Sequence, residues 1–435
     1  MNLESNPANK LSGEVICPGD KSISQRILII GSLLNCDLKI SGFLDAEDPN
    51  STMKALNNLG SSITKDNNIV AISHRLKPFS NPSSFLDLGN SGTGMRLLTG
   101  FISGLNIAAT LTGDDSLSKR PMSRVVDPLT AMGKEISTNN GKAPIQIIGG
   151  KIRKNFEYVM PIASAQVKSS LMLASLSSGN SIKITESKIT RDHTEKMIEY
   201  LGGSIEISKS SESKTIYLKN SELSKISSYE VVGDFSSAAF IIVAALISKN
   251  SEVMIKNVGL NKTRSGLLEI LLRMNANIEI INKTKTCNEE CGDIIVKSSQ
   301  LEGINVPNSI IPNIIDEIPI LSIAASFAEG QTIIKNASEL KVKESNRLHA
   351  TSMGLKKMNI KHELLDDGLI IDGTKDDVEI HEEIQSFGDH RIAMSFLIAG
   401  LRSKNGVKVK DCINIETSFP NFTKTMNNLG MNINE

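Results

Sequence analysis

The sequence contains no tryptophan, and aromatic residues make up only 4% of its 435 residues. It also lacks a net charge, because 48 lysines and arginines balance 48 aspartates and glutamates. Such a chain has no overall positive field to attract nucleic acid. The longest uninterrupted apolar run, 238–247, is far too short to span a bilayer, and the first residues show no signal-like pattern. We therefore expect a cytoplasmic protein without nucleic acid or membrane partners.

The five cysteines are scattered and show no disulfide-like pattern, which is typical of a reducing compartment. Cys287 and Cys291 lie close together, but a zinc site needs further ligands and no histidine lies near them in the sequence. We expect a polar loop there. The sequence predicts neither a bound metal nor a cofactor.

A short segment recurs six times, in which an amphipathic helix ends at a leucine or methionine and an alternating strand often follows. The recurring positions are Leu59, Met132, Leu201, Met274, Met358 and Leu429. Their spacing, mostly roughly 70 residues, is too long for a thin solenoid repeat and fits a small α/β unit.

A second recurring segment is a polar or glycine-containing turn that runs into an apolar helix, as in "GDFSSAAFIIVAALIS". Because these helices are apolar on nearly all sides, we expect strands to cover them. Six such units are too many for one compact core, so two lobes of three repeats are the economical arrangement. We place one lobe at residues 16–232 and a discontinuous lobe at 1–15 plus 233–435, with the active site in the cleft between them.

Polar and charged residues gather where the apolar helices begin. If the helices of a lobe run parallel, their N-termini share one face, where free N–H groups and aligned dipoles favour anions. Any one charge could equally be a solvated residue at a helix end, and His193 and His390 fit a structural role better than a catalytic one. Recurrence at equivalent positions favours an anionic substrate. The helix-opening residues are Lys21, Ser22, Arg26, Asn90, Arg96, Ser164, Gln166, Lys168, Asp316, Glu317, Asp389, His390 and Arg391.

Nine motifs between Gly19 and Phe422 resemble, in order, the signature series of the EPSP synthase (3-phosphoshikimate 1-carboxyvinyltransferase) family. One motif alone would be weak evidence, whereas nine in order over nearly the whole chain are strong evidence. The resemblance implies a two-lobed inside-out α/β barrel of six repeats, the enolpyruvyl transferase fold, in agreement with the repeat count. The motifs are "GDKSISQR", "LGNSGTGMRLL", "GDDSLSKRPM", "SAQVKSSLMLA", "TRDHTEKM", "DEIPIL", "LKVKESNRL", "GDHRIAMSF" and "SFPNF".

The resemblance implies transfer of the enolpyruvyl group of phosphoenolpyruvate to the 5-hydroxyl of shikimate 3-phosphate, with release of phosphate. This step belongs to the shikimate pathway to chorismate and the aromatic amino acids, and it is the target of glyphosate. By similarity, Asp316 is the base on the hydroxyl and Glu344 exchanges a proton with the methylene carbon. Lys21 would lie between the two substrates and complete the catalytic set.

The resemblance also implies how the two anionic substrates are bound. Guanidinium groups suit this task because they match a carboxylate or phosphate with two parallel hydrogen bonds. By similarity the contacts are Ser22 and Arg26 to the shikimate carboxylate; Arg120, Gln166 and the backbone of Gly92 to the phosphate of phosphoenolpyruvate; Arg347 and Arg391 to its carboxylate; and Ser164, Lys343 and Arg191 to the 3-phosphate of shikimate.

Two positions depart from the pattern of many relatives. Ala165 stands at a substrate-binding position where they have serine, so one hydroxyl contact to the phosphate of shikimate 3-phosphate is missing or replaced. Thr417 stands where they have lysine, so one contact to a substrate carboxylate or phosphate is missing or replaced. Together with Arg191 in "RDHTE", these departures resemble the class II subgroup, whose members often tolerate glyphosate. Gly92, by contrast, stands where some tolerant relatives carry alanine. We therefore expect intermediate sensitivity to glyphosate.

Two other functions compete with this interpretation. UDP-N-acetylglucosamine enolpyruvyl transferase shares the fold, but it should carry a reactive cysteine in the segment 113–124, which contains none. A non-catalytic, anion-binding repeat protein would have no reason to retain Asp316 and Glu344 beside Lys343 and Arg347. We therefore expect an enzyme whose partners are shikimate 3-phosphate and phosphoenolpyruvate, and which acts as a monomer.

Overall fold

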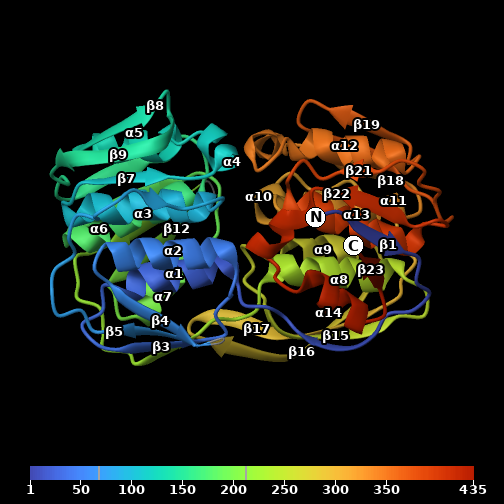
Figure 1. Ribbon diagram of the computed structural model, residues 1–435, viewed down its shortest axis with the longest axis horizontal. Coiled ribbons are helices and arrows are strands. Elements are labelled where there is room, and N and C mark those ends of the chain that lie inside the picture. The colour runs from blue at the N-terminus through green and yellow to red at the C-terminus, as the bar shows by residue number, and fades with distance from the viewer. Residues whose placement is uncertain (67–68, 211–212) are drawn as a thin grey trace. The chain divides into compact units, whose positions relative to one another are not determined.

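A computed structural model of the chain describes residues 1–66, 69–210 and 213–435. Within these residues the chain forms six small sheets and divides into two compact units, and Figure 1 labels many of their elements. Unit 1 comprises Met1–Pro18, Gly233–Thr284 and Glu290–Glu435, and unit 2 comprises Gly19–Val232 and Lys285–Glu289.

The sheets of unit 2 have the orders β14-β3-β5-β4, β6-β7-β9-β8 and β10-β11-β13-β12. In each sheet the first two strands are parallel and the last two form an antiparallel hairpin. Parallel neighbours need a long crossover, and a helix supplies it between β6 and β7 and between β10 and β11. The strands are β3 (Leu38–Ser41), β4 (Ser62–Asp66), β5 (Ile69–Ser73), β6 (Leu86–Asp87), β7 (Ala109–Thr112), β8 (Lys134–Asn139), β9 (Lys142–Gly150), β10 (Phe156–Val159), β11 (Ile182–Glu186), β12 (Ile205–Lys209), β13 (Lys214–Leu218) and β14 (Ser228–Glu230).

The helices of unit 2 alternate between an inner and an outer position along the chain. The inner helices are α1 (Lys21–Gly31), α3 (Gly92–Leu105) and α6 (Ala165–Ser178), and the others are α2 (Glu47–Asn58), α4 (Asp115–Lys119), α5 (Ser123–Ala131) and α7 (His193–Tyr200). Two glycines let α3 approach the backbone of α6. A Cβ added at Gly100 would lie 2.0 Å from the carbonyl oxygen of Ser170, and one at Gly104 would lie 2.4 Å from that of Ala174. Only glycine fits such a contact.

The sheets of unit 1 have the orders β16-β17-β15-β2, β18-β20-β19 and β21-β22-β1-β23, and two of them contain one parallel pair, β15 with β2 and β21 with β22. Their strands are β1 (Leu3–Asn6), β2 (Ser12–Ile16), β15 (Glu252–Gly259), β16 (Asn277–Thr286), β17 (Glu289–Lys297), β18 (Gln331–Ile334), β19 (His362–Leu365), β20 (Gly368–Asp372), β21 (Ile384–Gln385), β22 (Val407–Lys410) and β23 (Asn432–Asn434). The helical segments are α8 (Phe235–Ile247), α9 (Gly266–Arg273), α10 (Ile311–Ile314), α11 (Ile318–Ser326), η1 (Ser338–Val342), α12 (Arg347–Lys357), α13 (His390–Ala399), η2 (Gly400–Arg402), η3 (Cys412–Thr417) and α14 (Phe422–Asn428).

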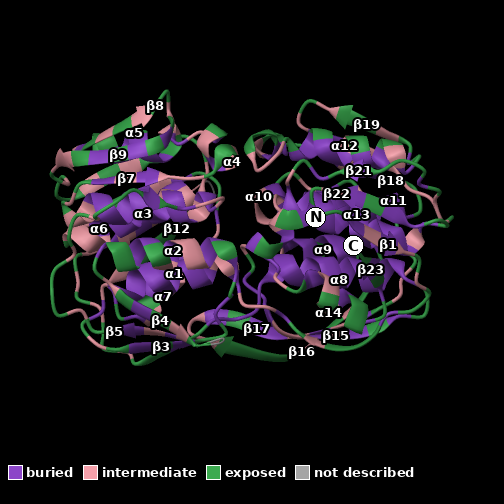
Figure 2. Ribbon diagram, in the orientation of Figure 1, coloured by how far each residue is buried: buried purple, intermediate pink, exposed green. Residues whose placement is uncertain are grey.

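The inner helices of unit 1 are buried along their whole length. Every residue of α8, α11 and α13 is buried, as the purple ribbons of Figure 2 show. This confirms the prediction that helices apolar on all sides lie inside the sheets. No helix in the described ranges is long and apolar enough to cross a membrane.

Two strands pair away from the helix that they precede. β2 leads into α1 of unit 2 but pairs in parallel with β15 of unit 1, and β14 leads into α8 of unit 1 but pairs in parallel with β3 of unit 2. The predicted boundary between residues 15 and 16 therefore falls inside β2. A backbone hydrogen bond follows each of these two strands. The amide of Asp20 donates to the carbonyl of Val232 (2.8 Å), and the amide of Asp234 donates to the carbonyl of Pro18 (2.7 Å).

Candidate functional site

The inner helices of unit 2 each begin at a side chain that caps the first turn. Asp20 accepts a hydrogen bond from the amide of Ile23 (2.8 Å) ahead of α1. Ser91 and Ser164 cap α3 and α6 in the same way, by accepting from amides of the first turn. Such caps satisfy one free N–H group of each helix and leave others for a ligand. The side chains predicted for the site in this unit lie in or near these first turns.

Lys21 is held at the start of α1 by a carboxylate of the neighbouring helix. Its Nζ lies 3.1 Å from Oδ2 of Asp48, and its side chain keeps 16% of its surface exposed. The next turn of α1 carries Gln25, which is buried and donates to Ser91 Oγ (2.6 Å) and Thr52 Oγ1 (3.1 Å). Gln25 therefore ties α1 to α2 and α3 and fixes the position from which Lys21 projects. Sequence reasoning gave Gln25 no role.

Arg26 is buried, yet its partners are neutral. Its Nε donates to Thr194 Oγ1 (2.8 Å), its Nη2 to Ser169 Oγ (3.1 Å) and its Nη1 to the carbonyl of Ser22 (3.0 Å). Burial lowers the pKa of the Arg26 guanidinium from its usual value to about 10. The group is still charged at neutral pH, so the site holds a cation that an anionic ligand can neutralise.

Gly92, Arg120 and Gln166, which were predicted separately, lie together around Arg96. Oε1 of Gln166 accepts from Arg96 Nη1 (2.9 Å), and Arg120 donates to Asn90 Oδ1 (2.6 Å). A Cβ added at Gly92 would lie 2.9 Å from Nη1 of Arg120 and 3.0 Å from Nη1 of Arg96. The first turn of α3 therefore brings backbone N–H groups and two guanidinium groups to one place, which suits a phosphate.

Lys168 does not belong with these residues. It is completely buried, and its Nζ lies 2.8 Å from Glu195 Oε1 and 3.1 Å from Glu186 Oε1. Lys214 lies 3.0 Å from the same oxygen of Glu195. Burial raises the pKa of the Glu195 carboxyl, but the two lysines outweigh burial and hold that pKa below its ordinary value. The expectation that Lys168 faces an anion at the helix N-terminus is therefore wrong.

In unit 1, Arg347 gathers three carboxylates at the start of α12. Its Nη1 lies 3.1 Å from Asp316 Oδ1, its Nη2 2.6 Å from Glu344 Oε2 and its Nε 2.7 Å from Asp389 Oδ2. Lys343 Nζ lies 3.3 Å from the same oxygen of Asp316. Burial lowers the pKa of Arg347, but the three carboxylates outweigh it and raise that pKa above its usual value. Four of the predicted site residues, Asp316, Lys343, Glu344 and Arg347, thus lie in one cluster.

Arg391 lies beside this cluster, at the start of α13. It donates to the carbonyl oxygen of Asp316 (3.1 Å) and lies 3.5 Å from Oε1 of Glu317. Glu317 is fully buried, accepts from the hydroxyl of Ser236 and lies 3.4 Å from Arg264 Nη1. Sequence reasoning gave Arg264 no role.

The remaining predicted positions are placed as follows. Ser22, Ala165 and Arg191 are half-buried. Thr417 is buried and donates to the carbonyl of Asn414 (2.7 Å), so its side chain is turned toward its own backbone turn.

Within the described part of the chain, no group of three or more His, Cys, Asp or Glu side chains could hold a metal ion.

His193 is buried and has a partner of its own. Its Nδ1 lies 2.8 Å from Oε1 of Glu289, which is also buried. The contact joins α7 to the segment that follows the turn of the β16–β17 hairpin, and Cys287 lies in that turn. This geometry fits the structural role that the sequence favours for His193.

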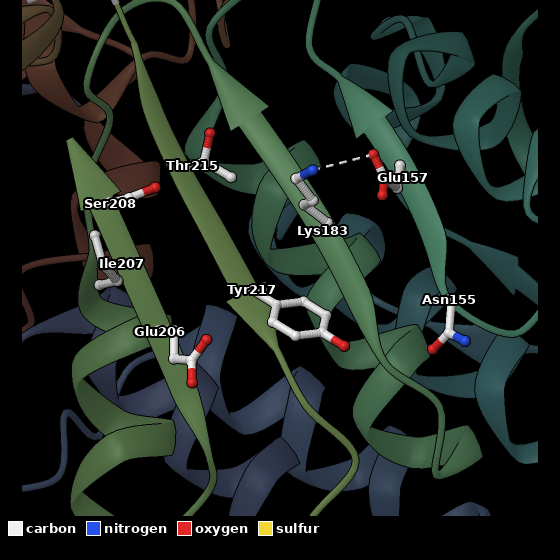
Figure 3. A pocket seen from close by; sticks show the side chains of 8 residues that line it. All are labelled: Asn155, Glu157, Lys183, Glu206, Ile207, Ser208, Thr215 and Tyr217. Atoms are coloured by element: carbon white, nitrogen blue, oxygen red, sulfur yellow. Dashed lines mark hydrogen bonds and ion pairs between the residues drawn. The ribbon is translucent and has the colours of Figure 1, made fainter. Parts of the chain in front are cut away.

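A hollow of about 430 Å³ lies on the β10-β11-β13-β12 sheet of unit 2, away from all these residues. Figure 3 shows the ion pair between Lys183 and Glu157 (3.3 Å) among the side chains on its floor. Both partners are exposed, as expected of a solvated sheet face. This hollow carries none of the predicted side chains, so we do not assign the candidate site to it. It is lined by Asn155, Glu157, Lys183, Glu206, Ile207, Ser208, Thr215 and Tyr217.

Comparison with known proteins gives a consistent result. Residues 5–426 match the family described as EPSP synthase (3-phosphoshikimate 1-carboxyvinyltransferase). The 3-phosphoshikimate 1-carboxyvinyltransferase of Legionella pneumophila (strain Lens) is 43% identical, covering 100% of this chain and 99% of the relative. That of Petrotoga mobilis is 44% identical, covering 98% of both. The solved structure of EPSP synthase from Acinetobacter baumannii superimposes with a TM-score of 0.86 at 38% identity over 100% of both chains.

Proposed function

The chain belongs to the EPSP synthase family, and from this premise we propose which of its residues carry the reaction. The chain transfers the enolpyruvyl group of phosphoenolpyruvate to the 5-hydroxyl of shikimate 3-phosphate, with release of phosphate, in the shikimate pathway. The fold is the mixed α/β fold of this family, in which six small sheets correspond to the repeats of the inside-out barrel. The assignment of residues to steps is our proposal.

The first step joins the two substrates. The 5-hydroxyl oxygen attacks the central carbon of the enolpyruvyl group, while Asp316 takes the hydroxyl proton and Glu344 gives a proton to the methylene carbon. The observation that carries this assignment is Arg347, which lies between both carboxylates at 3.1 and 2.6 Å. A shared guanidinium orients the two groups, and orientation is a large part of such catalysis.

The second step reverses the proton transfer at the methyl group. Glu344 takes back a proton as the carbon–oxygen bond to phosphate breaks, which restores the double bond. The proton of the 5-hydroxyl finally leaves with the released phosphate. Lys21, placed between the substrates, stabilises the charge of the leaving phosphate. Its Nζ carries three N–H donors, and among the described residues the hydrogen bond to Asp48 uses one of them, which leaves donors for this task.

The residues proposed to bind the anionic groups of the substrates come from both units. We propose that Asn90 and Arg96 support the phosphate contacts of Arg120, Gln166 and Gly92, because they are bonded to them directly. The proposed contacts are Ser22 and Arg26 for the shikimate carboxylate; Ser164, Ala165, Arg191 and Lys343 for its 3-phosphate; Gly92, Arg120 and Gln166 for the phosphate of phosphoenolpyruvate; and Arg347 and Arg391 for its carboxylate.

A phosphate-release assay tests the proposed function. The purified chain should release phosphate only when shikimate 3-phosphate and phosphoenolpyruvate are both present, and a chelator should not change the rate. UDP-N-acetylglucosamine in place of shikimate 3-phosphate should give no phosphate. Release with UDP-N-acetylglucosamine alone as acceptor would assign the chain to the sister enzyme, and release with neither acceptor would leave only anion binding.

We further propose that the chain belongs to the class II subgroup and has intermediate sensitivity to glyphosate. The motifs "SAQVK", "RDHTE" and "NKTR" and the residues Ala165 and Thr417 support this. Gly92 leaves the phosphate pocket without the methyl group that hinders the longer inhibitor. Glyphosate inhibition measured at several phosphoenolpyruvate concentrations tests the proposal, and inhibition as strong as that of a fully sensitive relative would contradict it.

We propose a monomer that works in the cytoplasm. Both substrates have proposed contacts within one chain, so the site needs no second copy. Light scattering coupled to size-exclusion chromatography should give the mass of one chain, 47.1 kDa, with and without substrates. A dimer mass at assay concentration would contradict this.

A further inference from the structure

We propose that Ser169 and Thr194 are positioning residues that aim the guanidinium of Arg26 at the substrate carboxylate. The inference rests on the proposed function, which assigns Arg26 to the carboxylate of shikimate 3-phosphate. It adds two residues for which neither the motifs nor the comparisons give a role.

The three residues lie on three different helices and meet in the interior of unit 2. Arg26 lies on α1, Ser169 on α6 and Thr194 on α7, and all three are at least nine-tenths buried. The hydroxyls accept from Nε and Nη2 of Arg26 and lie 2.7 Å from each other. The two hydroxyls therefore form one rigid pair that receives one edge of the guanidinium.

This arrangement leaves donors for a ligand. A guanidinium has five N–H groups. The hydroxyl pair and the carbonyl of Ser22 take three of them, one each on Nε, Nη2 and Nη1. In the described residues, one N–H thus stays on Nη1 and one on Nη2, the two nitrogens that bind a carboxylate side by side. The hydroxyl pair fixes the plane in which that fork lies.

The choice of hydroxyls also keeps the charge of Arg26 available. A carboxylate at either position would form an ion pair and compete with the carboxylate of the substrate. The chain places its ion pair at the adjoining positions, since Lys168 precedes Ser169, Glu195 follows Thr194, and Lys168 Nζ lies 2.8 Å from Glu195 Oε1. That buried pair holds α6 against α7 and keeps the hydroxyls at their spacing, while Arg26 retains its full positive charge.

Single substitutions separate positioning from general stability. In titration calorimetry, Thr194→Val should weaken binding of shikimate 3-phosphate about tenfold, the scale of one lost charged hydrogen bond, and Ser169→Ala about fivefold. At saturating substrate both variants should keep kcat within about twofold, because neither side chain touches the reacting atoms. The Michaelis constant for phosphoenolpyruvate should not change. Thr194→Ser keeps the hydroxyl and should bind like the unchanged chain.

Ser170→Ala is the matched control. Ser170 is the next residue on α6 and is equally buried, but its hydroxyl has no hydrogen-bond partner within the described residues. The control should bind shikimate 3-phosphate like the unchanged chain. Should Thr194→Val fail to fold, as judged by circular dichroism, Ser169→Ala measured against Ser170→Ala carries the same comparison.

A second ligand identifies the group of the substrate that Arg26 binds. An analogue of shikimate 3-phosphate with a hydroxymethyl group in place of the carboxylate should bind Thr194→Val and the unchanged chain equally. An equal loss for both ligands, or variants that bind like Ser170→Ala, would overturn the inference and leave the proposed function intact. Failure of the unchanged chain to bind shikimate 3-phosphate would overturn both.

Discussion

The two units hold their central arginines in opposite ways. In unit 1, Arg347 is surrounded by the carboxylates of Asp316, Glu344 and Asp389. In unit 2, Arg26 is held by two hydroxyls and a carbonyl. An arginine that is paired with carboxylates keeps them in a fixed geometry and offers less of its charge to a ligand than one held by neutral oxygens. Unit 1 is therefore suited to orienting acids and bases beside the substrate groups proposed for Lys343, Arg347 and Arg391, and the neutral setting of Arg26 in unit 2 is suited to binding an anion.

Unit 2 also contains buried ion pairs, but they do not include the residues proposed to bind the substrate. Lys168, Glu186, Glu195 and Lys214 form a cluster of two positive and two negative groups, all of them buried. Such a cluster offers no net charge to a ligand. It joins α6, α7 and the sheet that carries β11 and β13, and therefore holds in place the helices that carry the proposed anion-binding residues.

The largest expected effect comes from breaking this cluster. Glu195→Gln should lower the free energy of unfolding by about 3 kcal/mol at neutral pH, because it leaves Lys168 and Lys214 buried with one carboxylate. The folded-state pKa of Glu195 is below its ordinary value of 4.5, so its contribution is complete above that pH and is lost as the pH falls through the folded-state pKa. Urea unfolding measured from neutral to acidic pH should show that the free energies of unfolding of the unchanged chain and of Glu195→Gln become equal as the pH falls.

Glu206→Gln is the control for that measurement. Glu206 pairs with Lys219 on the surface, where both side chains are largely exposed, so its replacement should hardly change stability. Equal stability of the Glu195→Gln and Glu206→Gln variants would mean that the buried cluster does not support unit 2.

The second effect concerns the chemistry assigned to unit 1. Asp316→Asn and Glu344→Gln should each lower kcat at least about a hundredfold, the usual scale for a lost general acid or base, with little change in substrate dissociation constants. Asp366→Asn, at an exposed position that pairs with Lys341, should leave kcat unchanged. Near-normal turnover in either site variant would remove that residue from its proposed role and blur the contrast between the units.

A third variant would make unit 2 resemble unit 1. Gln166→Glu keeps the shape of the side chain but places a carboxylate 2.9 Å from Arg96, where an amide oxygen now lies. The Michaelis constant for phosphoenolpyruvate should rise about thirtyfold, roughly 2 kcal/mol, because the new charge repels the phosphate. Gln146→Glu on the exposed side of β9 is the matched control. An unchanged constant would show that neutral partners are not what suits unit 2 to anions.

The smallest expected effect concerns selectivity within the same pocket. Gly92→Ala should weaken glyphosate inhibition about tenfold, roughly 1.4 kcal/mol, with a smaller rise in the Michaelis constant for phosphoenolpyruvate. The added methyl group meets the ends of Arg120 and Arg96 at 2.9 and 3.0 Å, and these flexible ends can shift for the smaller ligand.

Gly149→Ala is the control for that selectivity test, because a Cβ there meets only an ordinary contact at 3.6 Å. It should leave both constants unchanged. Equal proportional rises of the two constants in Gly92→Ala would mean that Gly92 controls access to the pocket and does not discriminate between the two ligands.

The fold could be predicted from the sequence because its signal is repeated and local. A helix such as α8, apolar on every side, can lie only inside, and its residues are all buried. The motifs likewise led to Asp316, Glu344 and Arg347, which the structure joins in one cluster. Their roles in catalysis stay predictions.

The supporting contacts could not be predicted, because they join distant repeats through common residue types. Ser169 and Thr194 are ordinary hydroxyl residues in sequence, and only the packing of α6 against α7 and α1 makes them partners of Arg26. Lys168 was misjudged for the same reason. It follows Gln166 by two residues, which on a helix directs its side chain away from that of Gln166, toward Glu186 and Glu195.

The two strands that pair away from their following helices set the order in which a nascent chain can fold. Residues 19–232 contain nearly all of unit 2, including β14, so its sheets can assemble while later residues are still being added on the ribosome. β2 is made early, but its partner β15 begins only at Glu252, and β1 must wait for β22 and β23 near the end of the chain. β1 and β2 are therefore made before the other described strands but are among the last of them to pair.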